Sequence, residues 1–133
     1  MKRLALLLSA LLLVACSTKP SDELVSQQVT AQLLQRHNAQ VFEVVNLHKL
    51  NGIARDDNRY DVEVEYDLRF LVDLQDASKR LQQQSGSIFA AGMEATALGL
   101  AYGNFKQGDT IHNKEWVHFV RSEKGWLIDQ PQR

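Results

Sequence analysis

The sequence predicts a small α+β domain, in which an N-terminal amphipathic helix packs on a curved antiparallel sheet of about four strands. A helical insertion is expected between the two hairpins of that sheet. Apolar residues recur every four positions over residues 22–37, and apolar and polar residues alternate over residues 60–74. A second pair of strand-like segments follows residue 110. These periods are typical of helices and of half-buried strands.

The helix is expected to begin after Ser21, whose hydroxyl can accept a hydrogen bond from a free amide of the first turn. Val25, Val29 and Leu33 form an apolar stripe, and glutamines fill the other face. Such a stripe faces a protein core. We expect the helix to end near residues 37–38.

Two strands are predicted next, residues 41–50 and residues 60–74, joined by a loop that contains Gly52 and residues 56–58. The second strand alternates almost without a break, which predicts one buried face and one face in water. At about 3.3 Å per residue it would span roughly 50 Å. We therefore expect it to bend, to bulge or to project beyond its neighbours.

The face of this strand that meets water carries an acidic row, made up of Asp61, Glu63, Glu65 and Asp67. Such a row could engage a basic partner, but surface charge patterns are common and weakly diagnostic. Cross-strand pairing with basic residues such as Lys49, Lys114 or Arg121 explains it more simply.

Residues 110–121 and 125–128 predict a second hairpin, because Gly125 can supply the positive φ that such a turn often needs. The element order over residues 21–130, with its closing strand, resembles the cystatin-like and nuclear-transport-factor-like α+β folds. In those folds a curved sheet wraps around a helix. Many unrelated functions share this architecture, so the resemblance implies a fold and no activity.

The insertion between the hairpins comprises residues 76–105. Residues 76–84 are polar and can form a helix, residues 85–87 break it, and residues 88–105 are mostly apolar or small. Small residues recur there every four positions, which makes Ala91, Ala95, Gly99 and Gly103 the candidate partner-binding residues. Such a stripe allows another backbone to approach closely. The segment serves the protein's own core, a docked partner or a contact with the bilayer. The last is disfavoured because the segment lacks the Lys and Arg typical of helices at a membrane interface.

The first sixteen residues have the plan of a secretory signal peptide. A basic start at Lys2 and Arg3 precedes an apolar run of about eleven residues, which is too short for a transmembrane helix of roughly twenty. Leu13-Val14-Ala15-Cys16 then resembles the lipobox of bacterial lipoproteins, with an aliphatic residue, a tolerated residue, a small residue and the cysteine.

The lipoprotein resemblance implies that residues 1–15 are removed and that Cys16 becomes the lipidated N-terminus. Two or more acyl chains would anchor the protein stably, since each buried methylene contributes roughly 0.8 kcal/mol. Because Ser17 follows the cysteine, and not aspartate, the resemblance implies the periplasmic face of a Gram-negative outer membrane. Residues 16–21 would form a short tether, which would hold the domain, residues 22–133, close to the membrane.

Removal of the leader leaves 118 residues with 13 Lys and Arg against 16 Asp and Glu, a net charge of −3. A mildly acidic chain without a basic patch has no electrostatic footprint for nucleic acid. Cys16 is the only cysteine, so its use by lipid would leave none for a disulfide within the chain. The fold must then depend on packing.

The sequence contains no Gly-x-Ser-x-Gly elbow, His-Glu-x-x-His helix or phosphate loop. His112 and His118 would lie roughly 20 Å apart on one strand, too far to share a metal ion. Each is better interpreted as a solvated or hydrogen-bonded histidine. We therefore expect no catalytic residues, no metal site and no cofactor.

These features favour a non-enzymatic, membrane-anchored periplasmic lipoprotein that docks a protein partner, as an accessory of a cell-envelope assembly or secretion system. The alternative is a carrier or sensor that holds a small apolar ligand between helix and sheet. An enzyme would need a cleft with convergent titratable residues of perturbed pKa.

Overall fold

A computed structural model describes residues 17–130 of the chain. The elements follow in the order α1 (Asp22–His37), β1 (Phe42–Asp56), β2 (Arg59–Phe70), α2 (Leu74–Ser85), α3 (Ile88–Tyr102), β3 (Thr110–Ser122) and β4 (Gly125–Ile128). The predicted α+β fold class is confirmed. The predictions for the leader and for Cys16 lie outside the described residues.

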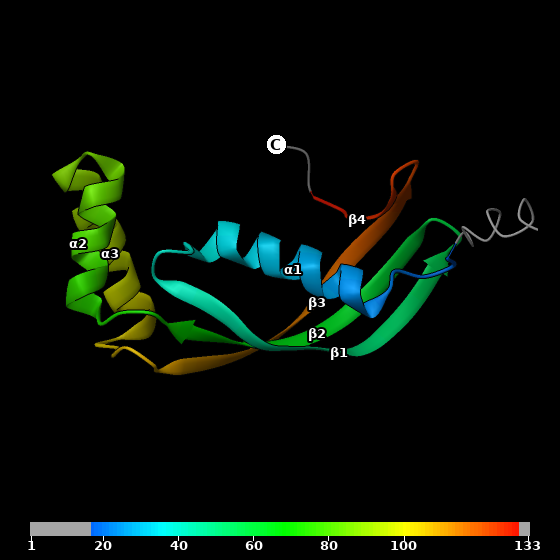
Figure 1. The fold of residues 1–133 in the computed structure, drawn as a ribbon, viewed down its shortest axis with the longest axis horizontal. Coiled ribbons are helices and arrows are strands. Elements are labelled where there is room, and N and C mark those ends of the chain that lie inside the picture. The colour runs from blue at the N-terminus through cyan, green and yellow to red at the C-terminus, as the bar shows by residue number, and fades with distance from the viewer. Residues whose placement is uncertain (1–16, 131–133) are drawn as a thin grey trace, which may run out of the picture.

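The four strands form one antiparallel sheet in the order β1-β2-β3-β4. The sheet is strongly curved, and α1 lies along its concave face (Figure 1). Val25, Val29 and Leu33 are each at most 1% exposed, so the predicted stripe is the buried face of α1. Ser21 caps α1 as expected, because its Oγ accepts a hydrogen bond from the Leu24 amide at 3.2 Å.

Strand β2 supplies the centre of the core. Its inward side chains are all buried, and they are Tyr60, Val62, Val64, Tyr66, Leu68 and Phe70. Because side chains alternate along a strand, the intervening residues point to the opposite face. The alternation that predicted a half-buried strand is confirmed over this range.

The predicted end of the first strand was wrong, because β1 continues to Asp56 and includes Gly52. The Tyr60 ring covers Gly52, where an added Cβ would come within 2.7 Å of Tyr60 Cε1. Gly52 therefore permits the close approach of an aromatic ring and does not form a turn. The turn is shorter than expected, since Asp56 already pairs with Arg59.

The second strand is also shorter than predicted, because β2 ends at Phe70. The Leu71 amide bonds the Val41 carbonyl at 2.8 Å, and Leu74 already begins α2. The alternation continues past the strand because Val72 is buried and Leu74 packs against the core. The expected irregularity instead falls on β1, which has three shifts in its pairing with β2. Such bulges bend a strand and increase its twist.

Helices α2 and α3 form a hairpin at one end of the sheet (Figure 1). The strands on either side of it remain paired, with Arg69 opposite Thr110. Phe105 stacks on Phe70 with ring centroids 3.8 Å apart, and Tyr102 packs its edge against both Phe70 and Phe42 at 5.6 Å. We call Phe42, Phe70, Tyr102 and Phe105 the base cluster. It joins the helical hairpin to the sheet.

The predicted break between the two inserted helices is confirmed. Gly86, with φ of 64°, ends α2, and Ser87 caps α3 by accepting a hydrogen bond from the Ala90 amide at 3.3 Å. Helix α3 is shorter than the predicted segment 88–105, because Gly103 ends it with φ of 70°. Gly103 is therefore outside the helix.

Replacement of Leu33, which is fully buried, should create a cavity between α1 and the sheet. We expect Leu33→Ala to lower the free energy of unfolding by about 2–5 kcal/mol, measured by urea denaturation. Leu100→Ala is the matched control, because Leu100 is 84% exposed and its change should stay within about 0.5 kcal/mol. Equal losses from the two variants would contradict this packing.

Candidate functional site

The larger apolar side chains of α3 lie in water. Ile88 is 75% exposed, Phe89 80%, Met93 62% and Leu100 84%. Phe89, Met93 and Leu100 are spaced by four and seven residues, which places them on one side of a helix with 3.6 residues per turn. We call these three residues the α3 face. Its exposed side chains form an apolar surface at one end of the molecule.

The small-residue stripe of α3 lies on the opposite side of the helix and faces the protein itself. Ala91 is buried, and Ala95 packs against the core. A Cβ added at Gly99 would lie 3.5 Å from Leu74 of α2. Ala91, Ala95 and Gly99 therefore make contacts within the chain. The candidate partner residue Gly103 ends the helix.

The exposed α3 face is a surface that the sequence reasoning missed. Its signal was present in the spacing of Phe89, Met93 and Leu100. However, α3 carries apolar or small residues around most of its circumference, with one charge at Glu94. The pattern alone therefore could not indicate which side another element covers.

The space between α1 and the sheet is filled by buried side chains, which is where an apolar ligand was expected under the carrier alternative. A cleft of about 220 Å³ lies nearby, between the end of α1 and α3. It is lined in part by Phe42, Leu98 and Tyr102. Ligand pockets are commonly about 300–1,000 Å³. A cleft of about 320 Å³ between α1 and β4 reaches that size, but four of its seven lining residues are glutamines. It therefore lacks the predominantly apolar lining expected for an apolar ligand.

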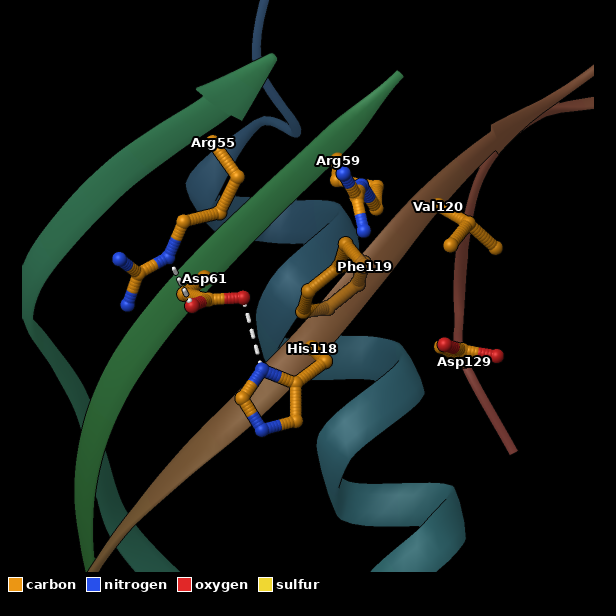
Figure 2. Close-up of a pocket in the computed structure, with 7 residues that line it drawn as sticks. All are labelled: Arg55, Arg59, Asp61, His118, Phe119, Val120 and Asp129. Carbon is orange, nitrogen blue, oxygen red and sulfur yellow. Dashed lines mark hydrogen bonds and ion pairs between the residues drawn. The ribbon is translucent and has the colours of Figure 1, made fainter. Parts of the chain in front are cut away.

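On the other face of the sheet, Asp61 is a buried carboxylate between two basic side chains (Figure 2). Asp61 is 7% exposed. His118 donates from Nδ1 to its carboxylate at 2.7 Å, and Arg55 donates from Nε at 2.5 Å. The three residues come from β2, β3 and β1 and line an open cleft of about 450 Å³.

The hydrogen bond from His118, and then that from Arg55, hold the pKa of Asp61 below its ordinary value, although burial acts in the opposite direction. The carboxylate therefore stays ionised at neutral pH. The carboxylate accepts the hydrogen bond from His118 Nδ1, so the second ring nitrogen, Nε2, takes no part in this pairing. The His118 side chain is 63% exposed.

An imidazole oriented by a carboxylate is a general base only where a nucleophile or substrate proton lies within reach. The cleft is lined by Arg55, Arg59, Asp61, His118, Phe119, Val120 and Asp129, with no Ser, Thr or Cys. The same pair recurs further along the strands, where His112 lies 2.9 Å from Asp67. Recurrence at directly opposite positions is typical of cross-strand pairing. In residues 17–130, no three His, Cys, Asp or Glu side chains are grouped to hold a metal ion.

Three acids of the row pair with residues of the neighbouring strands, Asp61 with Arg55 and His118, and Glu65 and Asp67 with His112. Among the described residues Glu63 forms no ion pair, and the three basic partners predicted for the row form none with it. Lys49 lies opposite the inward residue Val64 and bonds Asp22 of α1 at 3.2 Å. Arg121 lies over the Trp126 ring instead. Lys114 does lie opposite Glu65 in the register. The bulges in β1 change which of its residues face the acids, and sequence alternation could not predict that.

The segment before α1 is fixed to the domain from Ser17 onward. The Trp126 indole donates from Nε1 to the Ser17 carbonyl at 3.1 Å, and Pro20 is fully buried. This segment lies at the end of the sheet opposite the α2–α3 hairpin (Figure 1). The predicted tether is thus packed against β4 over its described part.

None of the helices within residues 17–130 has the length and apolar character needed to cross a membrane. No family model, curated protein or solved structure matches the chain.

Asp61→Asn should remove the charged acceptor of His118 and Arg55 and lower the free energy of unfolding at pH 7 by about 1–3 kcal/mol. The folded pKa lies below the ordinary value of 3.8, so this stabilisation is complete above that value and is lost as the pH falls through the folded pKa. We expect the difference between the variant and the parent in urea unfolding to begin to shrink below about pH 4 and to shrink further as the pH falls through the folded pKa. Glu123→Gln, in the β3–β4 turn, is the control, and its free energy of unfolding should follow that of the parent from pH 7 to pH 3. A difference that stays constant from pH 7 to pH 3 would contradict the pairing.

Proposed function

We propose that the chain is a non-enzymatic lipoprotein of the bacterial outer membrane, anchored through Cys16 on the periplasmic side, which docks a protein partner through the α3 face. The observation that carries the proposal is the exposure of Phe89, Met93 and Leu100 on one side of α3. A contiguous exposed apolar surface marks an interaction site more often than an unused one.

The chemistry of the α3 face selects an apolar partner surface. None of its three side chains carries a charge, and the one charged residue of α3, Glu94, accepts a hydrogen bond from Asn38 at 3.3 Å. Burial of apolar surface contributes roughly 25 cal/mol per Å². A partner that presents an uncharged helix or strand face, such as a subunit of an envelope assembly, fits this surface best.

The position of α3 favours a protein partner over the bilayer. Strand β2 has 12 residues and runs from the end of the sheet near Ser17 to the hairpin, a length along the curved strand of roughly 40 Å at 3.3 Å per residue. With lipid on Cys16, the α3 face would project away from the membrane. The face also lacks the Lys and Arg that helices resting on a membrane carry.

The base cluster adds to this proposal because it holds α3 in one orientation. Phe105 and Phe70 stack at 16° between ring planes. A preformed surface loses little conformational entropy on binding. The α3 face therefore does not need to fold on its partner.

The proposal is tested by placing a photo-crosslinking residue singly at positions 89, 93 and 100 in cells. We expect the same protein adduct from all three positions, identified by mass spectrometry. Position 127 is the control, since Leu127 is an exposed apolar residue of β4. Phe89→Ser with Leu100→Ser should then reduce the adduct from position 93 by tenfold or more, about 1.4 kcal/mol. An adduct of two copies of this chain, adducts with lipid, or an adduct equal to that of position 127 would contradict the proposal.

A further inference from the structure

A second surface lies at the opposite end of the molecule, where the described chain begins. A groove of about 510 Å³ is formed there by the entering segment and by the β3–β4 turn. Lys19 comes from the entering segment, Lys124 from the turn and Arg121 from the end of β3 beside the turn. Glu123 is the acid among the lining residues. We call this surface the anchor groove.

No acid within the described part of the chain forms an ion pair with the three cations of the anchor groove. Among residues 17–130, none of the ion pairs involves Lys19, Arg121 or Lys124. The nearby acid Asp22 is paired with Lys49 instead. The mature chain would carry a net charge of −3, so a groove with three cations and one acid differs in sign from the molecule as a whole.

We propose that the anchor groove rests on the bilayer and that its three cations contact the phosphates of anionic phospholipids. This inference rests on the proposed lipid at Cys16. Ser17 is held by Trp126 in the groove, and consecutive Cα atoms are about 3.8 Å apart, so acyl chains on Cys16 would enter the membrane directly beside it.

In this arrangement the acyl chains on Cys16 supply the affinity for the membrane. The three cations of the anchor groove set the orientation of the domain. Once the chain is anchored, contact of the groove with the headgroups is an intramolecular event at high effective concentration. Each basic residue close to an anionic membrane favours the contact by about fivefold. The acidic row on the outer face of the sheet is repelled by the same surface. One orientation is therefore selected, in which the α2–α3 hairpin points into the periplasm.

The test uses the full, lipidated chain in vesicles of phosphatidylcholine with phosphatidylglycerol. Because Cys16 is the only cysteine, Ser122→Cys or Gln84→Cys introduces a single free thiol for a fluorophore. Position 122 lines the anchor groove, and position 84 lies near the far tip of the hairpin. With a nitroxide quencher on the lipid headgroup, we expect the label at 122 to be quenched at least threefold more than the label at 84.

Lys19→Gln, Arg121→Gln and Lys124→Gln together should reduce that difference, as should vesicles of phosphatidylcholine alone. Lys106→Gln with Lys114→Gln is the control for cations elsewhere and should leave it unchanged. Equal quenching at 122 and 84 in the lipidated chain, or a difference that the triple variant leaves unchanged, would overturn the orientation alone. The mass of the intact protein distinguishes failure of the orientation from failure of the anchor. A purified chain without lipid on Cys16 would overturn anchoring and orientation together.

Discussion

The base cluster is the contact on which the arrangement of the molecule depends. Phe70 is the last residue of β2, and it stacks on Phe105, which follows α3, with ring centroids 3.8 Å apart. Aromatic pairs of this kind contribute about 0.5–1.5 kcal/mol beyond the area they bury. The strands on both sides of the insertion stay paired up to Arg69 and Thr110. The helical hairpin therefore cannot swing without breaking the packing at its base, and α3 has a fixed direction relative to the sheet.

This fixed direction separates two surfaces of different chemistry. The α3 face is apolar and uncharged, whereas the anchor groove carries Lys19, Arg121 and Lys124. The curved sheet with α1 on its concave side lies between them (Figure 1). In the function that we propose, the end with the anchor groove contacts the membrane, and the end with the α3 face presents a preformed surface to a protein. A rigid sheet is then a spacer that keeps the two contacts apart.

Local periodicity predicted the helix around Val25, Val29 and Leu33 and the central strand, because each buries one face against the same core. Periodicity gave the wrong role for residues whose contacts lie elsewhere in the sequence. Gly52 was interpreted as a loop residue, although the Tyr60 ring explains it. Gln28 was assigned to the polar face of α1, yet its amide bonds the Trp126 carbonyl at 2.8 Å and the Ile128 amide at 2.9 Å. The anchor groove brings Lys19 and Lys124 together from opposite ends of the chain, and no local pattern contains that information.

The central claim is that the α3 face is held away from the anchored end, and a distance measured by pulsed electron spin resonance tests it most directly. Nitroxides at Ser122→Cys and Gln84→Cys would span the molecule from the β3–β4 turn to the tip of the hairpin. The structure predicts one narrow distribution at long distance, because the labels lie at opposite ends of strands that are about 40 Å long along their curved path. A short or broad distribution would mean that the hairpin folds back or swings, and it would contradict the claim.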